Sequence, residues 1–180
     1  MFLLALGVLG HWIGRSFRLF LVSLLVFSGC WAEEDVTLSH VGAIAGKHWD
    51  IVNDVAVDQQ GFVYLVGESW SDFIWLGGER QTAGRRGASD AFVVKINPKD
   101  KRVVYLAFLG GRGEDRGTAL VVDNEGAVYL VGETKSQDFP STGKMSLRQG
   151  GSDAFVAKLR PDGAQFDFVR IWGGRGQDRA

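Results

Sequence analysis

Two stretches of this sequence decide its fold: VAVDQQGFVYLVGE at residues 55–68 and LVVDNEGAVYLVGE at residues 120–133. They align with an offset of 65 residues, since Asp123 stands at the place of Asp58 and 123 − 58 = 65. Each begins with a short apolar run, turns at Asp-x-x-Gly and continues into Val, Tyr and Leu, which favour strands. Each stretch therefore predicts a β-hairpin, and the chain contains that hairpin twice.

The similarity between the two copies continues beyond the hairpin. SDAFVVKI at residues 89–96 recurs as SDAFVAKL at residues 152–159, an offset of 63, since 152 − 89 = 63. GGRGEDR at residues 110–116 recurs as GGRGQDR at residues 173–179 with the same offset, since 173 − 110 = 63. A repeat of this length indicates an architecture of stacked supersecondary units.

Each unit is predicted to hold four strands, which in the first copy lie at residues 55–58, 62–68, 90–96 and 102–109, with a loop-rich stretch over 69–88. Several strands are apolar at consecutive positions, most clearly VVYLAFL at residues 103–109. A strand with one solvated face would alternate, so both faces are expected to be buried. Four-stranded sheets stacked face to face are the blades of a β-propeller, so we predict an all-β propeller fold with two blades present.

The repeat also resembles a known family, the bacterial β-propeller repeat called SBBP, from about Val36 to the end of the chain. The resemblance rests on the DAFV-x-K strand, the GG-x-G-x-D corner, the VD-x-x-G-x-VY hairpin and SQDFP at residues 136–140. The first copy departs from the pattern, with AGKHWD at residues 45–50 and DFI at residues 72–74. The resemblance implies a propeller fold, with no catalytic residues and no cofactor.

The chain is expected to contain a leader followed by a partial propeller. Residues 1–32 form the leader, which is predicted to be helical, and residues 33–180 form the propeller part. The latter divides into an outer strand at 36–44, repeat units at 50–111 and 115–174, and the start of a third unit at 175–180. Since propellers typically have about 4–8 blades, two units predict either a fragment of a longer propeller or several chains that assemble into a ring.

The leader has the order of parts found in a secretory signal peptide. Arg15 and Arg18 precede an apolar run at residues 19–27, and Ser28-Gly29-Cys30 follows it. The segment at residues 27–30 resembles a lipobox, in which Cys30 would become the first mature residue and carry the lipid. The alternatives are cleavage by a signal peptidase after Ala32 and a leader that stays uncleaved as a membrane anchor. The protein is therefore expected to be exported, as a periplasmic, outer-membrane-anchored or extracellular protein that meets the membrane only through its leader or lipid.

The charge of the chain argues against nucleic acid as a partner. The net charge is −1, from 20 basic and 21 acidic residues. Without Arg15 and Arg18 the remainder has 20 − 2 = 18 bases against 21 acids, or −3. Phosphate binding needs a concentrated basic face, which this balance does not favour.

Few residues stand out as functional candidates. Trp70 and Trp75 lie in the loop-rich stretch, where exposed indole rings would stack on sugars; the alternative is that they pack as loop aromatics. No Ser-His-Asp order, pair of catalytic carboxylates or metal-ligand pattern stands out, so no catalytic, cofactor or metal residue is predicted. The remaining prominent positions are interpreted as structural turns: Asp50, Asp58, Gly61, Gly110, Gly111, Asp115, Asp123, Gly126, Gly173, Gly174 and Asp178.

These observations favour an exported, non-catalytic propeller module that binds an unknown protein or glycan at the cell surface or in the periplasm. A carbohydrate-binding propeller is one alternative, and a truncated reading frame without independent function is another. Fold alone does not decide among them.

The lipobox interpretation predicts fatty-acid incorporation at one residue. Metabolic labelling with a radioactive fatty acid should label the wild-type protein, and Cys30→Ser should abolish the label, because the thiol is the acceptor. An unlabelled wild-type protein would rule out lipidation and favour a cut after Ala32.

Overall fold

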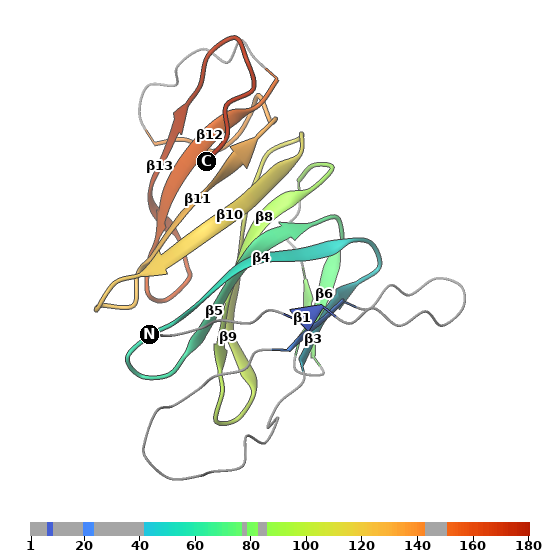
Figure 1. The fold of residues 1–180 in the computed structure, drawn as a ribbon, viewed down its shortest axis with the longest axis vertical. Helices are drawn as coiled ribbons and strands as arrows, with labels where there is room; N and C mark the ends of the chain where they lie inside the picture. The colour runs from blue at the N-terminus through green and yellow to red at the C-terminus, as the bar shows by residue number, and fades with distance from the viewer. Residues whose placement is uncertain (1–6, 9–19, 24–41, 77–78, 83–85, 143–150) are drawn as a thin grey trace.

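The computed structural model describes residues 7–8, 20–23, 42–76, 79–82, 86–142 and 151–180. These residues form thirteen strands in three antiparallel sheets, and none of them lies in a helix. Accordingly, no helix in this part of the chain has the length and hydropathy needed to cross a membrane. Figure 1 shows two of the sheets as successive layers along the long axis of the molecule.

The two repeat units fold into the two larger sheets, which we call blade 1 and blade 2. Blade 1 has the strand order β4 (Asp50–Val57), β5 (Val63–Ser69), β8 (Asp90–Asn97) and β9 (Arg102–Leu109). Blade 2 repeats it with β10 (Asp115–Val122), β11 (Val128–Thr134), β12 (Asp153–Leu159) and β13 (Phe166–Trp172). The prediction of stacked, four-stranded antiparallel blades is confirmed, and the two blades do not close a ring (Figure 1).

The third sheet contains strands in two stretches where the sequence predicted none, the loop-rich stretch at 69–88 and the leader at 1–32. Its order is β1 (Gly7–Val8), β2 (Phe20–Ser23), β3 (Gly42–Gly46), β6 (Phe73–Leu76) and β7 (Glu79–Thr82). Strands β6 and β7 form a hairpin inside the stretch predicted to be loop-rich. The sequence carries its signal, because the Gly-Gly pair at 77–78 favours a two-residue turn.

The prediction that the leader is helical is wrong for the few residues of 1–32 that the structure describes. Gly7–Val8 and Phe20–Ser23 are strands, and no part of 1–32 that is described is helical. The residues Phe20, Leu21 and Val22 tolerate strand geometry well, and their backbone pairs with β3. Cys30, Ala32 and most of the predicted outer strand at 36–44 lie outside the described residues, and β3 covers only its end.

The first strand of each unit is longer than predicted. Strand β4 begins at Asp50 instead of Val55, and β10 begins at the equivalent Asp115. Both strands contain an irregularity in the pairing with the next strand, between Val52 and Asp54 in β4 and between Gly117 and Ala119 in β10. Such a bulge disturbs the strict alternation of side chains, so the pattern in the sequence showed only the regular second half of each strand.

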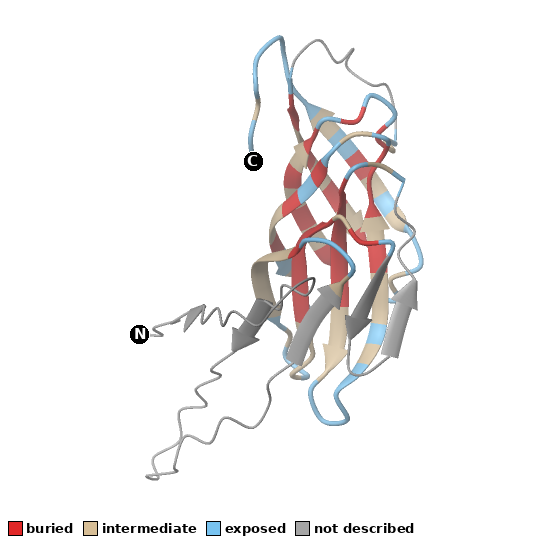
Figure 2. Cartoon of the chain, turned by 90° about the vertical axis from the view of Figure 1, so that its right-hand side faces the viewer, coloured by how far each residue is buried: buried red, intermediate tan, exposed pale blue. Residues whose placement is uncertain are grey.

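The main hydrophobic core lies between the two blades. Blade 1 supplies Tyr64, Val66 and Val93, and blade 2 supplies Val128, Leu130 and Phe155, all of them fully buried. Figure 2 shows this as a band of buried strand segments running through the stack. Burial of these side chains on both sides of the interface is the main favourable term for holding the blades together.

Strands of blade 1 and blade 2 differ in how many of their faces are covered. Six consecutive residues of β5 are buried, from Tyr64 to Ser69, whereas burial alternates along β11 and β12. Blade 1 is therefore covered on both faces, and blade 2 on the face toward blade 1. The prediction of strands buried on both faces is confirmed for β5 and is wrong for β9, its clearest case in the sequence, because β9 is the last strand of its sheet and Val104 is 51% exposed.

Gly132 sits where blade 2 has no room for a side chain. A Cβ atom there would lie 2.0 Å from the carbonyl oxygen of Arg116 and 2.7 Å from the ring of Phe155. Gly132→Ala should therefore lower the free energy of unfolding by about 1–3 kcal/mol, the usual cost of overpacking. Gly176→Ala is the matched control, because nothing lies within 4 Å of its Cβ position. Chemical denaturation would measure both; equal stabilities of the two variants would contradict this account.

Candidate functional site

The glycine-rich corners between strands are organised around buried carboxylates. Asp115 is fully buried, and its Oδ2 atom accepts hydrogen bonds from the Gly111 amide at 2.7 Å and the Ser136 hydroxyl at 2.5 Å. Its own amide donates to the carbonyl of Ser89 at 3.0 Å. The amides of this corner thus bind a carboxylate of the chain itself, as the structural interpretation of the corner requires.

The same kind of corner precedes blade 1 and follows blade 2. Asp178 accepts a hydrogen bond from the Gly174 amide at 2.7 Å, and its own amide donates to Ser152 at 2.9 Å. Asp50 accepts from the Gly46 amide, also at 2.7 Å. Gly110 and Gly173 are close to further carboxylates, because a Cβ atom at either position would lie within 2.5 Å of Oδ1 of Asp90 or Asp153.

The hairpin turns use their aspartates in the same way. The Oδ1 atom of Asp58 accepts from the amides of Gln60 and Phe62, and Gly61 adopts a φ of 88° that suits glycine. Asp123 accepts from the amides of Glu125 and Ala127, with Gly126 at a φ of 84°. Every residue that the sequence marked as a turn is placed in such a corner or turn.

Polar contacts fix the register of blade 2 on blade 1. The guanidinium of Arg116 lies 3.5 Å from the carboxylate of Glu68, and the Leu120 amide donates to Asp54 at 2.9 Å. Burial raises the pKa of Glu68 above its ordinary value of 4.5, and the charge of Arg116 offsets part of this effect. The blades are thus joined by an apolar centre and a polar edge.

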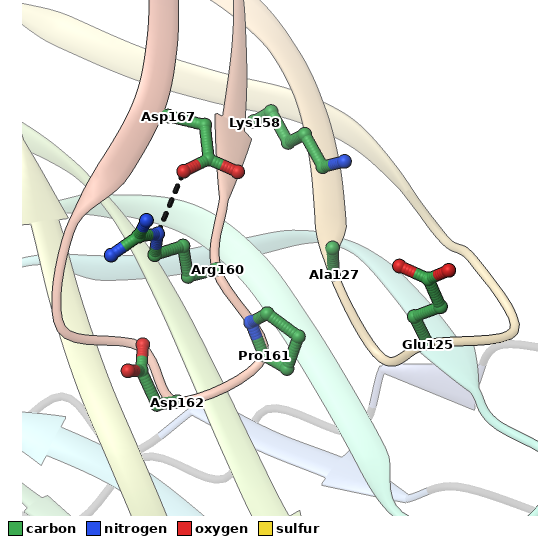
Figure 3. A pocket seen from close by; sticks show the side chains of 7 residues that line it. All are labelled: Glu125, Ala127, Lys158, Arg160, Pro161, Asp162 and Asp167. Carbon is green, nitrogen blue, oxygen red and sulfur yellow. Dashed lines mark hydrogen bonds and ion pairs between the residues drawn. The ribbon is translucent and has the colours of Figure 1, made fainter.

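The candidate binding site is a depression at the end of blade 2, where two turns meet (Figure 3). The turn between β10 and β11 supplies Glu125 and Ala127, and the turn between β12 and β13 supplies Pro161 and Asp162. The depression has a volume of about 390 Å³. Its lining is completed by Lys158, Arg160 and Asp167.

Charges of both signs line this depression. Arg160 binds Asp167 at 2.7 Å, and the amine of Lys158 lies 4.0 Å from Asp123 and 5.0 Å from the centre of the Tyr129 ring. A hydrogen bond to Tyr129 raises the pKa of Lys158 above its ordinary value, and nearby carboxylates add to the effect. Lys158 is therefore a fixed cation at neutral pH, suited to bind an anion and unsuited to act as a base.

The two repeats differ in one side chain at this depression. The counterpart of Lys158 in blade 1 is Lys95, whose amine lies 4.5 Å from the centre of the Phe62 ring. The counterpart of Phe62 is Ala127, a much smaller side chain. In the sequence this difference is visible as Phe62 in one hairpin and Ala127 at the same place in the other.

The tryptophans proposed from the sequence lie elsewhere. Trp70 is half-buried, and its amide donates to the carbonyl of Trp49 at 2.8 Å. Trp49 is 45% exposed. Trp75 is in strand β6, where it pairs with Ala45, and its side chain lies outside the described residues. The structure thus brings Trp70 beside Trp49, a neighbour that the sequence did not predict.

Metal ligands do not gather in the part of the chain that the structure describes. Among those residues, no three His, Cys, Asp or Glu side chains form a group able to hold a metal ion.

The fold and the corners define a protein built from β-propeller blades. Residues 44–74 match the family model of SBBP, described as a beta-propeller repeat. The matched stretch runs through β4 and β5 into β6, and blade 2 repeats the sequence and the fold of blade 1. The chain therefore carries an SBBP beta-propeller repeat. No curated protein matches the chain.

The raised pKa of Glu68 makes the stability of the protein depend on pH. Because the folded state holds this proton at a pH where the unfolded chain releases it, the contribution of Glu68 to stability grows as the pH falls through the raised pKa toward 4.5. Urea denaturation over this range should show the difference in unfolding free energy between wild type and Glu68→Gln moving in favour of wild type. A difference that is independent of pH would contradict the burial of the charge.

Proposed function

We propose that the chain is a non-catalytic binding module of an exported β-propeller protein, and that the depression at the end of blade 2 is part of its binding surface. The supporting observation is the set of charged side chains around a depression of about 390 Å³. The depression lies where two turns meet, and turns can change in sequence without disturbing the packing of one blade on the next.

The chemistry of the depression favours binding over catalysis. Arg160 is paired with Asp167, and Lys158 keeps its proton, so neither cation is suited to transfer a proton at neutral pH. The buried carboxylates of the corners are engaged by amides and hydroxyls of the chain. Fixed charges of both signs suit a partner that presents a carboxylate and a cation close together, as a protein surface does.

The binding surface can be tested in cells by photo-crosslinking. A benzophenone amino acid in place of Glu125 should give a discrete crosslinked product, and the additional change Arg160→Glu should reduce it several-fold. The control places the same group at Val104, which is 51% exposed on blade 1. Equal products from both positions would overturn the assignment of the depression.

A glycan is the second candidate ligand, favoured by the two neighbouring tryptophans. Trp49 is exposed and Trp70 half-buried, and the backbone hydrogen bond between them keeps the two residues together. Indole rings offer an apolar face with a polar edge, which suits the stacking of a sugar ring.

The carbohydrate hypothesis predicts loss of binding on a glycan array. Trp49→Ala combined with Trp70→Ala should abolish the signal of the wild-type protein, because both neighbouring indole rings are removed. Trp172→Ala, at an exposed position on blade 2, should leave the signal unchanged. Unchanged binding by the double variant would reject the tryptophan site.

A further inference from the structure

A lysine amine lies over aromatic rings at the same place in both blades. In blade 1 the Lys95 amine lies 4.5 Å from the centre of the Phe62 ring and 5.0 Å from the centre of the Tyr64 ring. In blade 2 the Lys158 amine lies 5.0 Å from the centre of the Tyr129 ring, which is the counterpart of Tyr64. The lysine and the tyrosine are thus placed alike in both blades.

Strand pairing keeps this lysine and this tyrosine together. In blade 1 Tyr64 is directly opposite Lys95 in the pairing of β5 with β8. In blade 2 Tyr129 is directly opposite Lys158 in the pairing of β11 with β12. Directly opposite side chains on antiparallel strands contact each other. The backbone of blade 2 therefore holds the Lys158 amine over the Tyr129 ring before any ligand binds.

Blade 2 lacks the second ring of this arrangement. Ala127 stands at the place of Phe62, and its methyl group offers no aromatic face to a cation. Ala127 is buried, and both Ala127 and Lys158 line the depression of Figure 3, so Ala127 forms part of its floor. The volume of about 390 Å³ leaves room for an aromatic side chain beside the amine.

We propose that the depression binds an aromatic side chain of a partner protein, which takes beside Lys158 the place that Phe62 has beside Lys95 in blade 1. The face of that ring meets the Lys158 amine, and its edge packs on Ala127. Aromatic residues are enriched at the buried centre of protein interfaces, where they act as anchors. This inference rests on the proposed function of the depression and adds the chemistry of the residue that it binds.

The charged rim of the depression favours a protein over a free aromatic compound as the source of the ring. Arg160 is bound to Asp167 at 2.7 Å, and the side chains of Glu125 and Asp162 are exposed at the two turns. The exposed carboxylates can accept hydrogen bonds from the amides of a peptide backbone on either side of the ring. An apolar centre within a polar rim is the usual composition of a protein interface.

Binding of a blocked aromatic amino acid tests the pocket directly. The probe is N-acetyl-para-fluorophenylalanine amide, and broadening of its fluorine NMR signal by the full chain reports binding. Unlabelled N-acetylphenylalanine amide should displace the probe, whereas N-acetylleucine amide should need a several-fold higher concentration, because leucine offers no aromatic face to the Lys158 amine. Equal displacement by the two compounds would overturn the inference, since any apolar group would then suffice.

Variants of the depression locate the bound probe. Ala127→Phe gives blade 2 the side chain that blade 1 has at this place and should abolish binding, because the new ring occupies the depression. The matched control is Val104→Phe, which adds a ring at a position 51% exposed on blade 1 and should leave binding unchanged. Lys158→Met keeps an unbranched side chain without its charge and should weaken binding about two- to fivefold. If circular dichroism shows that Ala127→Phe does not fold, Lys158→Met decides, and unchanged binding by either folded variant would overturn the inference.

The crosslinking assay separates this inference from the proposed function. If an aromatic residue of the partner is the anchor, Ala127→Phe should reduce the crosslinked product from position 125 several-fold. An undiminished product in Ala127→Phe would overturn the inference and leave the proposed function standing. The absence of any product from position 125 in the otherwise unchanged chain would overturn the proposed function and, with it, the partner inferred from it.

Discussion

Face-to-face packing of one four-stranded sheet on the next is the interaction on which the rest of this structure depends. Each strand satisfies its backbone within its own sheet, so the only apolar surface left to bury is the pair of sheet faces. Tyr64 and Val93 on blade 1 lose contact with water only because Leu130 and Phe155 of blade 2 cover them. The same side chains at Tyr129 and Val156 stay half-buried where no such cover is described. Burial in this fold is thus a property of neighbouring blades and not of a single repeat.

The corners determine how closely successive blades can follow one another. A buried carboxylate is costly unless hydrogen bonds compensate its charge. At Asp115 the Gly111 amide and the Ser136 hydroxyl provide that compensation from both sides of the corner. The glycines leave no side chain between backbone and carboxylate, so each corner is compact and is repeated at Asp50 and Asp178. Because these carboxylates accept hydrogen bonds from the chain itself, aspartates such as Asp50 and Asp115 can lie buried inside the fold.

The depression at the end of blade 2 lies where the two repeats differ. Lys95 and Lys158 occupy equivalent strand positions, but Phe62 lies against the first, and Ala127 stands at that place near the second. The stack of blades tolerates this change because it falls in a turn at the end of the sheet. The turns at the end of a sheet can therefore vary in sequence while the interface between blades stays the same.

The sequence by itself determined the two repeat units, the strands that begin at Asp90 and at Arg102, and the turns at Asp58 and Asp123. Apolar runs and turn residues act over short distances, so their effect can be read without the rest of the fold. It did not determine the early start of β4 and β10, where bulges disturb the alternation, nor the hairpin of β6 and β7. Only the tertiary structure placed Arg116 beside Glu68, Trp49 beside Trp70, and Glu125 and Arg160 around one depression. Those neighbours are far apart in the chain or belong to different turns, and their proximity follows from how sheets pair and stack, which no local pattern encodes.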